Sequence, residues 1–420
     1  MQTITMINHV LTLLFLICYG YQMVYMLLPF IKKAKKEQPG RLHRYAILIC
    51  ARNEEAVIGQ LIESIRRQDY PAELLQVFVA ADNCQDNTAA VAREAGAIVY
   101  ERENRIKVGK GYALQFLLDH IGNTYGTDTF DGYFVFDADN LLDECYISRM
   151  NQTFSQGYRI VTSYRNSKNY GDNWISAGYS LWFLHDSQYL NRSRMLAGTS
   201  CVVAGTGFLF AKDVLKKTGG WTFHTLTEDT EFTIANILEG EKVGYCEKAV
   251  LYDEQPTSFA QSWKQRMRWA KGYIQVFGKY GRQLAQQMVK RGNFTCYDML
   301  MANIPAISLT SIGFFIHLWA AGLGLFYDKT GVIASLLPLL KNLMGIYNMM
   351  FVMGTVATIS EWKQIHCSTG RKIGYLFTFP LFMMTYIPIS FSALFKKVEW
   401  QPILHNQSKT LEQVRGGSKR

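Results

Sequence analysis

Four short motifs hold most of the side chains in this chain that could do chemistry, and they occur in a fixed order. They are Asp82-Asn83-Cys84-Gln85-Asp86, Asp137-Ala138-Asp139, Thr227-Glu228-Asp229 and Gln265-Arg266-Met267-Arg268-Trp269. The first three supply carboxylates, which can ligate a hard cation, accept hydrogen bonds or act as a base. The fourth supplies a cation and an indole ring. Together they are typical of a site that handles a metal-bound diphosphate beside a polar substrate.

The first two motifs each follow a short apolar run that predicts a buried strand. Val77–Ala81 precedes Asp82, and Tyr133–Phe136 precedes Asp137. Ligands of an open parallel sheet bind beyond the carboxyl ends of its strands, so we expect both motifs at that edge. Asp82 could bind a base or ribose, or belong to an ordinary turn and helix cap. Asp137 and Asp139, at positions i and i+2 of an extended segment, could reach a ribose and a divalent cation.

The third and fourth motifs belong to predicted helices. Glu228 and Asp229 precede an apolar helical stripe, so they are either ordinary first-turn acids behind a Thr cap or a base that deprotonates an acceptor hydroxyl. Gln265, Arg268 and Trp269 stand at i, i+3 and i+4 and therefore share a helix face. On that face an arginine could offset the charge of a leaving diphosphate, and a tryptophan could stack on a sugar.

Two glycine-containing segments are further candidates. Lys107 and Lys110 border a loop with Gly109 and could bind phosphate, but the loop lacks the spacing of a P-loop. Gly205-Thr206-Gly207 resembles the start of a dinucleotide fingerprint, yet Phe210 stands where the third glycine belongs. We therefore expect a tight turn on the acceptor side of the site rather than a nicotinamide site.

Alternating strand and helix patterns over residues 40–255 must position these motifs. An α/β domain with a largely parallel sheet and helices on both faces follows from the alternation. The predicted strands are Tyr45–Cys50, Val77–Ala81, Ile98–Tyr100 and Tyr133–Phe136, and the predicted helices are Glu54–Gln68, Thr88–Ala95 and Gly111–Ile121.

Apolar segments of membrane length flank this domain. Residues 1–31 predict an uncleaved anchor, because the cations follow the apolar run instead of preceding it, which also favours a cytosolic domain. Those cations are Lys32, Lys33, Lys35 and Lys36. About three more spans are expected within 297–396, at 298–327, 331–360 and 373–395, before a tail at 397–420. Three crossings would put the tail outside, whereas Lys396 and Lys397 favour a cytosolic tail; a re-entrant last segment would reconcile the two.

Residues 256–296 differ from both regions. Phe259, Trp263, Met267 and Ala270 recur at helical spacing, and lysines and arginines occupy the other faces. A basic amphipathic helix with tryptophans suits a membrane interface, although an ordinary surface helix packed on the sheet would give a similar pattern.

Composition narrows the classes of function. The net charge is +10, but the cations cluster beside apolar spans, which favours anionic lipid, and no nucleic-acid-binding motif is present. None of the eight cysteines forms a Cys-x-x-Cys pair or a run with zinc spacing. We expect free thiols in a reducing compartment.

In order and spacing, these motifs make the chain resemble the membrane-embedded family 2 glycosyltransferases, which include hyaluronan, chitin-oligosaccharide, cellulose and poly-N-acetylglucosamine synthases. By motif the resemblance covers residues 45–275, and Gln-x-x-Arg-Trp after Thr-Glu-Asp is its most specific part. It implies a GT-A fold, a UDP-sugar donor, Mg²⁺ or Mn²⁺, and an inverting mechanism that gives β-linkages. It also implies membrane lipids and a growing glycan or lipid-linked acceptor as partners.

The resemblance also implies roles for individual residues. Asp229, beside Glu228, matches the catalytic base, and Gln265, Arg268 and Trp269 match the signature that lines the donor and acceptor sites. The nucleotide-sugar positions are Ala51, Arg52, Asn53, Glu54, Asp82, Lys110 and Asp137, with Asp139 at the metal position and Gly205 and Thr206 on the acceptor side.

Three readings of function follow. The signature favours a processive synthase that extends an exopolysaccharide. The span count, smaller than in cellulose synthases, puts an intramolecular polymer channel in doubt and keeps open a transferase that adds one or a few sugars to a membrane lipid. A non-catalytic transporter or scaffold is the third reading, and the complete motif set argues against it. Trp400 is either a mobile element over the donor or a tail residue resting on the membrane surface.

Overall fold

The computed structural model of this chain describes residues 2–33, 40–303, 309, 312–319, 322, 329–405 and 407–416. The strands are β1 (Tyr45–Ala51), β2 (Leu75–Asp82), β3 (Ile98–Arg102), β4 (Gly132–Asp137), β5 (Leu141–Leu142), β6 (Ile160–Ser167), β7 (Phe208–Ala211) and β8 (Val243–Asp253). The helices of the α/β domain are α2 (Ile58–Arg66), η1 (Ala72–Leu74), α3 (Thr88–Glu94), α4 (Lys110–Tyr125), α5 (Tyr146–Ser155), α6 (Trp174–His185), the π-helical turn η2 (Asp186–Asn191), α7 (Arg192–Ala197), α8 (Lys212–Thr218) and α9 (Glu228–Leu238). The remaining helices are α1 (Gln2–Ile31), α10 (Phe259–Arg291), α11 (Phe294–Asn303), α13 (Lys329–Ser360), α14 (Thr369–Met384), α15 (Tyr386–Phe395) and α16 (Leu411–Gly416).

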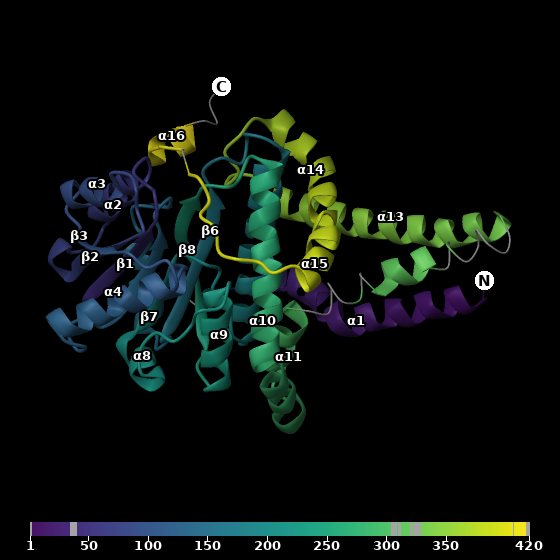
Figure 1. The fold of residues 1–420 in the computed structure, drawn as a ribbon, viewed down its shortest axis with the longest axis horizontal. Coiled ribbons are helices and arrows are strands. Elements are labelled where there is room, and N and C mark those ends of the chain that lie inside the picture. The colour runs from purple at the N-terminus through teal and green to yellow at the C-terminus, as the bar shows by residue number, and fades with distance from the viewer. Residues whose placement is uncertain are drawn as a thin grey trace.

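One eight-stranded mixed sheet forms the centre of the molecule, in the order β3-β2-β1-β4-β7-β6-β8-β5 (Figure 1). Strands β3, β2, β1 and β4 are parallel, as predicted. The sheet is largely parallel, as expected, but β7 runs antiparallel to β4 and β6, and β5 runs antiparallel to β8. The reason lies in the turn before β7: the Gly207 N–H donates to the Val135 carbonyl near the carboxyl end of β4. A strand that begins at this edge must run back through the sheet in the opposite direction.

The strand register brings the predicted motifs to one edge. Ala51 pairs with Ala81 of β2, and Cys50 pairs with Asp137 of β4. Arg52, Asp82 and Asp137 therefore leave the sheet side by side, as the strand pattern predicted.

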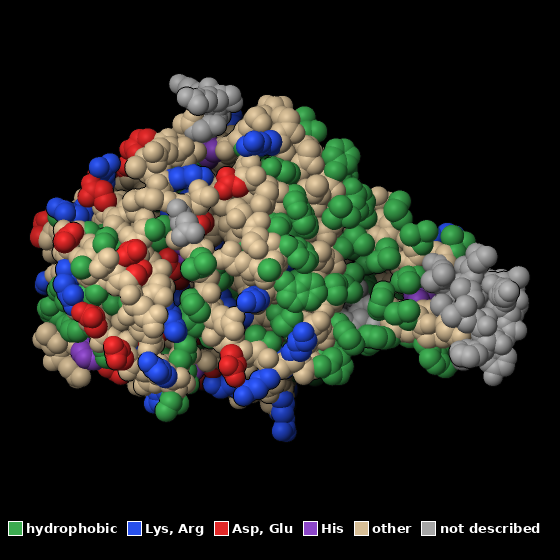
Figure 2. Space-filling view, turned by 45° about the horizontal axis from the view of Figure 1, so that its top comes forward, with side chains coloured by type: hydrophobic (Ala, Val, Ile, Leu, Met, Phe, Trp, Pro, Cys, Tyr) green, Lys and Arg blue, Asp and Glu red, His purple; other side chains and the backbone are tan. Residues whose placement is uncertain are grey.

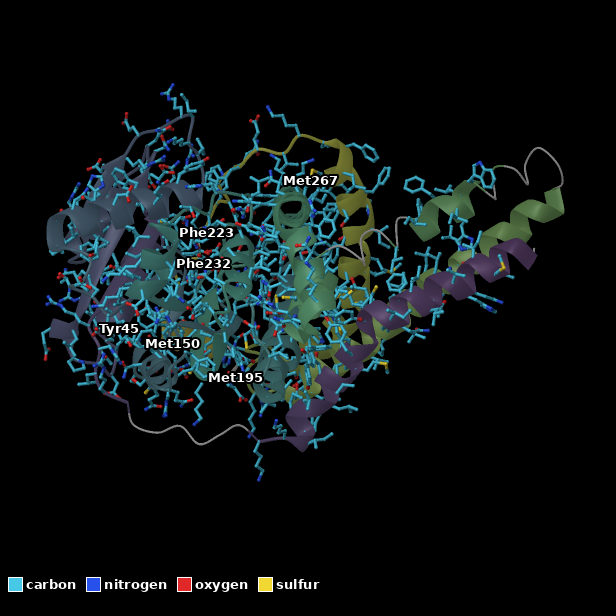
Figure 3. All side chains as sticks on the ribbon, turned by 90° about the horizontal axis from the view of Figure 1, so that it is seen from below. Tyr45, Met150, Met195, Phe223, Phe232 and Met267 are labelled. Carbon is cyan, nitrogen blue, oxygen red and sulfur yellow. The ribbon has the colours of Figure 1, made fainter. Side chains whose placement is uncertain are left out.

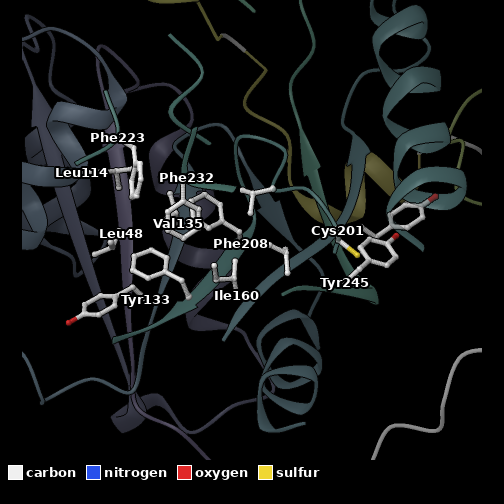
Figure 4. Close-up of a cluster of buried hydrophobic side chains, with 14 of the residues drawn as sticks. Leu48, Leu114, Tyr133, Val135, Ile160, Cys201, Phe208, Phe223, Phe232 and Tyr245 are labelled. Atoms are coloured by element: carbon white, nitrogen blue, oxygen red, sulfur yellow. The ribbon is translucent and has the colours of Figure 1, made fainter. Parts of the chain in front are cut away.

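The apolar core lies on both faces of this sheet, because successive strand side chains point to opposite faces. On β1, Leu48 packs with Leu114 of α4, whereas Ile47 packs with Leu61 of α2. Figure 4 shows the first layer, in which Leu48 and Val135 lie near Leu114, Phe223 and Phe232. The two layers hold the carboxyl edge of the sheet rigid.

Three described helices are long and apolar enough to cross a membrane, over Met6–Ile31, Leu339–Ser360 and Thr369–Phe395. Helices α1 and α13 extend away from the α/β body at the same end of the molecule (Figures 1 and 3). Hydrophobic side chains gather on the surface of that end, whereas charged side chains gather on the α/β body (Figure 2). The expected span at 298–327 lies partly outside the described residues, as do Lys35 and Lys36.

Helix α10 connects the α/β body to the apolar helices. It lies within the expected 256–296, and its Met267 and Ala270 pack against Ile389 and Ala393 of α15. Phe259, by contrast, is exposed. One part of the helix is therefore an ordinary packed helix, and its exposed aromatic side chains keep the interfacial interpretation open.

The C-terminal tail returns to the sheet. After α15 the chain passes in front of α10 toward the α/β body, and α16 lies beside the sheet (Figure 1). Leu411 and Val414 of α16 pack on Leu141 and Tyr252. The tail thereby crosses the same edge that carries the motifs.

Candidate functional site

The loops after β1 and β2 are tied together at the carboxyl edge. Asn53, in the left-handed region at φ 58°, accepts a hydrogen bond of 2.8 Å from the Gln85 N–H through its Oδ1. The Glu54 N–H donates to Thr88 Oγ1 at 2.8 Å, and Asp86 Oδ2 accepts the Glu55 N–H at 3.2 Å. Asp86 thus does the ordinary work of a turn, which leaves Asp82 as the available carboxylate of the first motif.

Asp82 is nevertheless paired. Its carboxylate accepts a hydrogen bond of 2.5 Å from Arg102 Nη1, and both side chains are buried. Burial raises the pKa of Asp82, and the Arg102 guanidinium opposes that rise. Arg102 Nη2 also donates to the Lys107 carbonyl at 2.6 Å, so this arginine holds the loop before α4. The sequence pattern did not single out Arg102. The feature that could have indicated its role is the presence of a charged residue at the end of an apolar strand.

Lys110, the first residue of α4, lies at the centre of the site. Its ammonium forms an ion pair with Asp137 and donates to the Gly205 carbonyl at 2.8 Å. Although burial opposes it, the charges of Asp137 and Glu228 raise the pKa of Lys110 and keep it cationic. The Asp137 N–H donates to Thr206 Oγ1 at 2.9 Å, which joins the predicted acceptor-side turn to the end of β4. Lys107, by contrast, is exposed.

Asp139 lies on a turn, not on the extended segment that its spacing suggested, because the Asn140 N–H bonds back to the Asp137 carbonyl. Its side chain is 4% exposed, and its Oδ2 accepts the Glu254 N–H at 2.8 Å. Burial works against ionisation, but the charges of His405 and Lys168 lower the pKa of Asp139. The carboxylate is therefore ionised and ready for a cation.

The donor set fits a metal that arrives with a diphosphate. Among the described residues, no group of three or more His, Cys, Asp or Glu side chains stands ready to hold an ion alone. Mg²⁺ and its relatives need only one or two protein carboxylates when substrate phosphates and water complete the shell. Asp139, with Asp137 two residues before it, meets that requirement.

An ion pair that the sequence analysis missed borders the acceptor-side turn. Asp253, the last residue of β8, accepts a hydrogen bond of 2.6 Å from Arg165 Nε, and Arg165 Nη1 donates to the Ala204 carbonyl at 2.9 Å. Burial raises the pKa of Asp253 to about 6. Neither residue belongs to a recognisable motif, so only their spatial position reveals them.

The carboxylates of Glu228 and Asp229 occupy the first turn of α9. Thr227 stands at the N-cap of α9 but makes no side-chain capping hydrogen bond, so the acids of the first turn, and not the threonine hydroxyl, face the free N–H groups of the helix. Burial, followed by the charge of Asp229, raises the pKa of Glu228 to about 7, and burial raises the pKa of Asp229. Lys110 and Arg268 oppose both shifts, which places both cations near the pair.

Gly205 leaves room beside this pair. A Cβ atom at Gly205 would stand 3.8 Å from Asp229 Oδ2 and 3.9 Å from Arg165 Nη1, and its φ of +81° is one that other residues rarely adopt. The base candidate and the turn therefore lie next to each other.

The Gln-x-x-Arg-Trp motif lies on α10 and shares one face, as predicted. Helix α10 comes close to the third motif, because a Cβ atom at Gly272 would stand only 2.5 Å from Thr227 Cγ2. Arg268 Nη1 donates weakly to the Leu226 carbonyl at 3.4 Å, and Gln265 Oε1 is buried without a partner among the described residues. Trp269 makes edge contacts with Tyr179 and Phe183, at ring distances of 5.8 and 6.2 Å.

The C-terminal tail covers the edge of the sheet beside Arg52 and Glu54. The Arg52 guanidinium lies 5.2 Å from the ring of Trp400, and a Cβ atom at Gly109 would stand 3.8 Å from Trp400 Cδ1. His405 Nδ1 lies 2.9 Å from Glu54 Oε1. Burial raises the pKa of Glu54 to about 7, and, although burial opposes it, the carboxylates of Asp139 and Glu54 raise the pKa of His405 to about 10. The tail imidazolium thus supplies positive charge to an acidic edge.

The structure brings all four motifs into one continuous site. Cations at Arg52, Lys110 and Arg268 and a carboxylate at Asp139 could hold a diphosphate with its metal. Asp229 could then take a proton from a hydroxyl placed beside Gly205.

The sequence profile of the family described as "Glycosyltransferase like family 2" matches residues 43–272. Over 375 residues the chain is 25% identical to the beta-monoglucosyldiacylglycerol synthase of Synechocystis sp., an alignment that covers 86% of this chain and 74% of that one. It is 22% identical over 243 residues to the poly-beta-1,6-N-acetyl-D-glucosamine synthase of Staphylococcus epidermidis, 57% of each chain.

Among solved structures, the chain is similar to the mannosyltransferase PcManGT from Pyrobaculum calidifontis, determined with GDP-Man and Mn²⁺. The TM-score is 0.50 at 16% identity, and the likeness covers 85% of this chain and 99% of that one. At this identity the likeness concerns the fold alone.

Proposed function

The chain belongs to glycosyltransferase family 2 and has the expected GT-A fold, and from this premise we propose that it transfers a hexose from a UDP-sugar to a hydroxyl of a membrane lipid. One observation carries the proposal. The Glu228–Asp229 pair lies near Arg268 of α10, and Met267 and Ala270 of the same helix pack on α15. The reacting groups therefore stand next to apolar helices. A lipid acceptor could reach such a site without leaving the membrane surface.

The donor would lie along the carboxyl edge of the sheet. In this proposal Ala51, Arg52, Asn53 and Glu54 border the nucleotide, Lys110 binds its phosphates, and Asp82 acts through Arg102. The Asp82 carboxylate already pairs with Arg102 at 2.5 Å. Asp82 would therefore either hold Arg102 against the loop before α4, or release Arg102 and accept a hydrogen bond from the ribose when the donor binds.

Asp139, with Asp137, would hold Mg²⁺ or Mn²⁺. When bound, such an ion offsets the negative charge that develops on the leaving diphosphate. The ionised and nearly buried state of Asp139 supports this assignment. Lys110 would supply positive charge from the protein itself at the same diphosphate.

Asp229 would act as the base, and Arg268 would face the leaving group. A single displacement at the sugar inverts its configuration, and the acceptor hydroxyl gives its proton to Asp229 as the new bond forms. Arg268 is suited to the leaving group because the hydrogen bond that it makes among the described residues, with the Leu226 carbonyl, is long and neutral. Trp269, already in edge contact with Tyr179 and Phe183, would form an apolar wall for the sugar.

Extension of a β-linked polysaccharide is the second candidate. The Gln-x-x-Arg-Trp motif favours it, and the aromatic wall of Trp269, Tyr179 and Phe183 could hold successive sugar rings. In either case we propose that the α/β domain is cytosolic and that the chain crosses the membrane several times, which Lys32 and Lys33 after α1 support.

The test is a transfer assay with purified full-length protein in detergent micelles. The donors are UDP-glucose, UDP-N-acetylglucosamine and GDP-mannose, the acceptor is dioleoylglycerol, and products are read by mass spectrometry. A glycolipid carrying one or a few hexoses is expected from a UDP-sugar, and Asp229→Asn is the inactive control. Long polymers would support the second candidate instead. The proposal is overturned if the protein shows no transfer and no donor hydrolysis with any of the three donors.

A further inference from the structure

A second carboxylate lies about one helical turn beyond the contact between α6 and α10, and no motif contains it. Asp186 is the first residue of the π-helical turn η2, which follows α6. Single π-helical turns carry an extra residue that re-aims the side chains around it, and they occur often at functional sites. The remaining residues of this turn are buried, whereas Asp186 is partly exposed.

Asp186 has no cation of its own among the residues that the structure describes. Its Oδ2 accepts a long hydrogen bond of 3.3 Å from Asn191 Nδ2. Burial raises its pKa, and the guanidinium groups of Arg194 and Arg165 oppose that rise from a distance. Both arginines are already committed to carboxylates, Arg194 to Asp298 at 2.8 and 2.9 Å and Arg165 to Asp253 at 2.6 Å. A partly exposed carboxylate in a poorly solvated place is thus left with spare acceptor capacity.

Tyr273 connects Asp186 to the proposed base. It stands four residues after Trp269 on α10 and therefore on the same helix face. Burial raises the pKa of its phenol, and the negative charges of Asp229 and then Asp186 raise it further, so the phenol lies within electrostatic reach of both carboxylates. Tyr273 is partly exposed as well.

An aromatic contact stands beside both residues. Phe183, three residues before Asp186, contacts Trp269 at a ring distance of 6.2 Å and lies 3.7 Å from the Arg165 guanidinium. Arg165 in turn borders Gly205, the residue that faces Asp229. Asp186 and Tyr273 therefore each stand about one helical turn beyond the contact between Phe183 and Trp269, on neighbouring helices.

We propose that Asp186 and Tyr273 bind a hydroxyl of a neutral acceptor and select against acceptors that carry a phosphate next to that hydroxyl. Two facts favour this ligand class: an ionised carboxylate accepts hydrogen bonds from hydroxyls, and it repels an anionic group in a poorly solvated site. Asp186 is a specificity residue here, because Asp229 remains the base. The inference rests on the proposed function, of which it names the acceptor class.

The experiment uses the full chain in detergent micelles. The neutral probes are dioleoylglycerol and cellobiose, and the anionic probe is dioleoylphosphatidylglycerol, which has free hydroxyls beside a phosphate. The variants are Asp186→Ala, Asp186→Asn and Tyr273→Phe. The matched control is Glu94→Gln, which removes an exposed carboxylate on α3. Thermal unfolding and donor KM show whether each variant is folded, and Asp186→Asn keeps the shape of the side chain if Asp186→Ala does not fold.

For Asp186→Ala we expect the KM of a neutral acceptor to rise about 10- to 100-fold, the scale of one lost hydrogen bond to a charged group, with donor KM and donor hydrolysis unchanged. Asp186→Asn should raise that KM less and should improve the use of phosphatidylglycerol relative to dioleoylglycerol. If folded Asp186 variants transfer sugar with an unchanged acceptor KM, this inference alone is overturned. It is also overturned if these variants lose donor hydrolysis to the same extent as transfer. A wild-type protein that neither transfers nor hydrolyses any donor overturns the proposed function itself.

Discussion

The carboxylate pair of α9 gives the sharpest test of the proposed chemistry, because its environment fixes the pH at which it can work. Glu228 and Asp229 are coupled, and burial raises both pKa values, that of Glu228 to about 7. A base acts only when deprotonated, so kcat/KM should fall as the pH falls through this raised pKa. Because burial raises the pKa of Asp229 above its ordinary value, kcat/KM should already have begun to fall from its plateau at pH 5.5. A solvated carboxylate with a pKa near 4 would lose only about 3% of its deprotonated form at that pH.

Two variants separate the members of the pair. Asp229→Asn should keep donor binding and lose about 10²–10⁴-fold in transfer at every pH, which corresponds to about 3–5 kcal/mol of transition-state stabilisation. Glu228→Gln removes one of two neighbouring negative charges, so it should keep part of the activity and move the acidic limb of the profile to lower pH.

The assay is sugar transfer between pH 5 and 9, with donor affinity from tryptophan fluorescence as the control for binding. A wild-type profile that stays flat down to pH 5 would refute the raised pKa. Near-normal transfer by Asp229→Asn would remove Asp229 from the role of base.

Three further outcomes are expected. Chelation by EDTA should stop transfer and added Mn²⁺ should restore it, and Asp139→Ala should weaken Mn²⁺-dependent donor binding by about 10- to 100-fold in calorimetry; full activity in EDTA would contradict the metal assignment. Arg268→Ala should lose at least about 10²-fold in kcat with an unchanged melting temperature, since the hydrogen bond that Arg268 donates to the Leu226 carbonyl is long, at 3.4 Å; lower stability with full turnover per folded molecule would make the arginine structural. Asp298→Ala should destabilise the protein by about 3–5 kcal/mol, because it leaves the Arg194 guanidinium, 2% exposed, without its buried partner; an unchanged thermal unfolding curve would show that this ion pair does not hold α7 to α11.

The sequence alone determined the parallel half of the sheet and the edge at which its motifs meet. Period-two and continuous apolar runs report burial directly, so β1, β2, β3 and β4 were predicted within a few residues of their observed ends. Strand ends then placed Asp82 and Asp137 without further information. The spacing of Gln265, Arg268 and Trp269 likewise fixed their common helix face.

Only the tertiary structure decided how these groups are partnered. Whether Asp82 is free depends on Arg102, which lies twenty residues away and meets it through the pairing of β2 with β3. The direction of β7 depends on a hydrogen bond between Gly207 and β4, and the turn at Asp139 depends on Asn140. Apart from the Asp137–Asn140 turn, these contacts join segments that lie far apart in the chain, so no local pattern encodes them.

The same limit applies to the residues that line the acceptor space. Asp186 belongs to no motif, and its chemistry comes from two arginines that are already bound to other carboxylates. Tyr273 and Asp229 come together because α10 packs closely against the start of α9 through Gly272. Sequence periodicity determines which residues face inward from each element. The pKa and the partners of a buried group depend instead on charges from distant elements, and the positions of these charges are fixed only when the elements pack together.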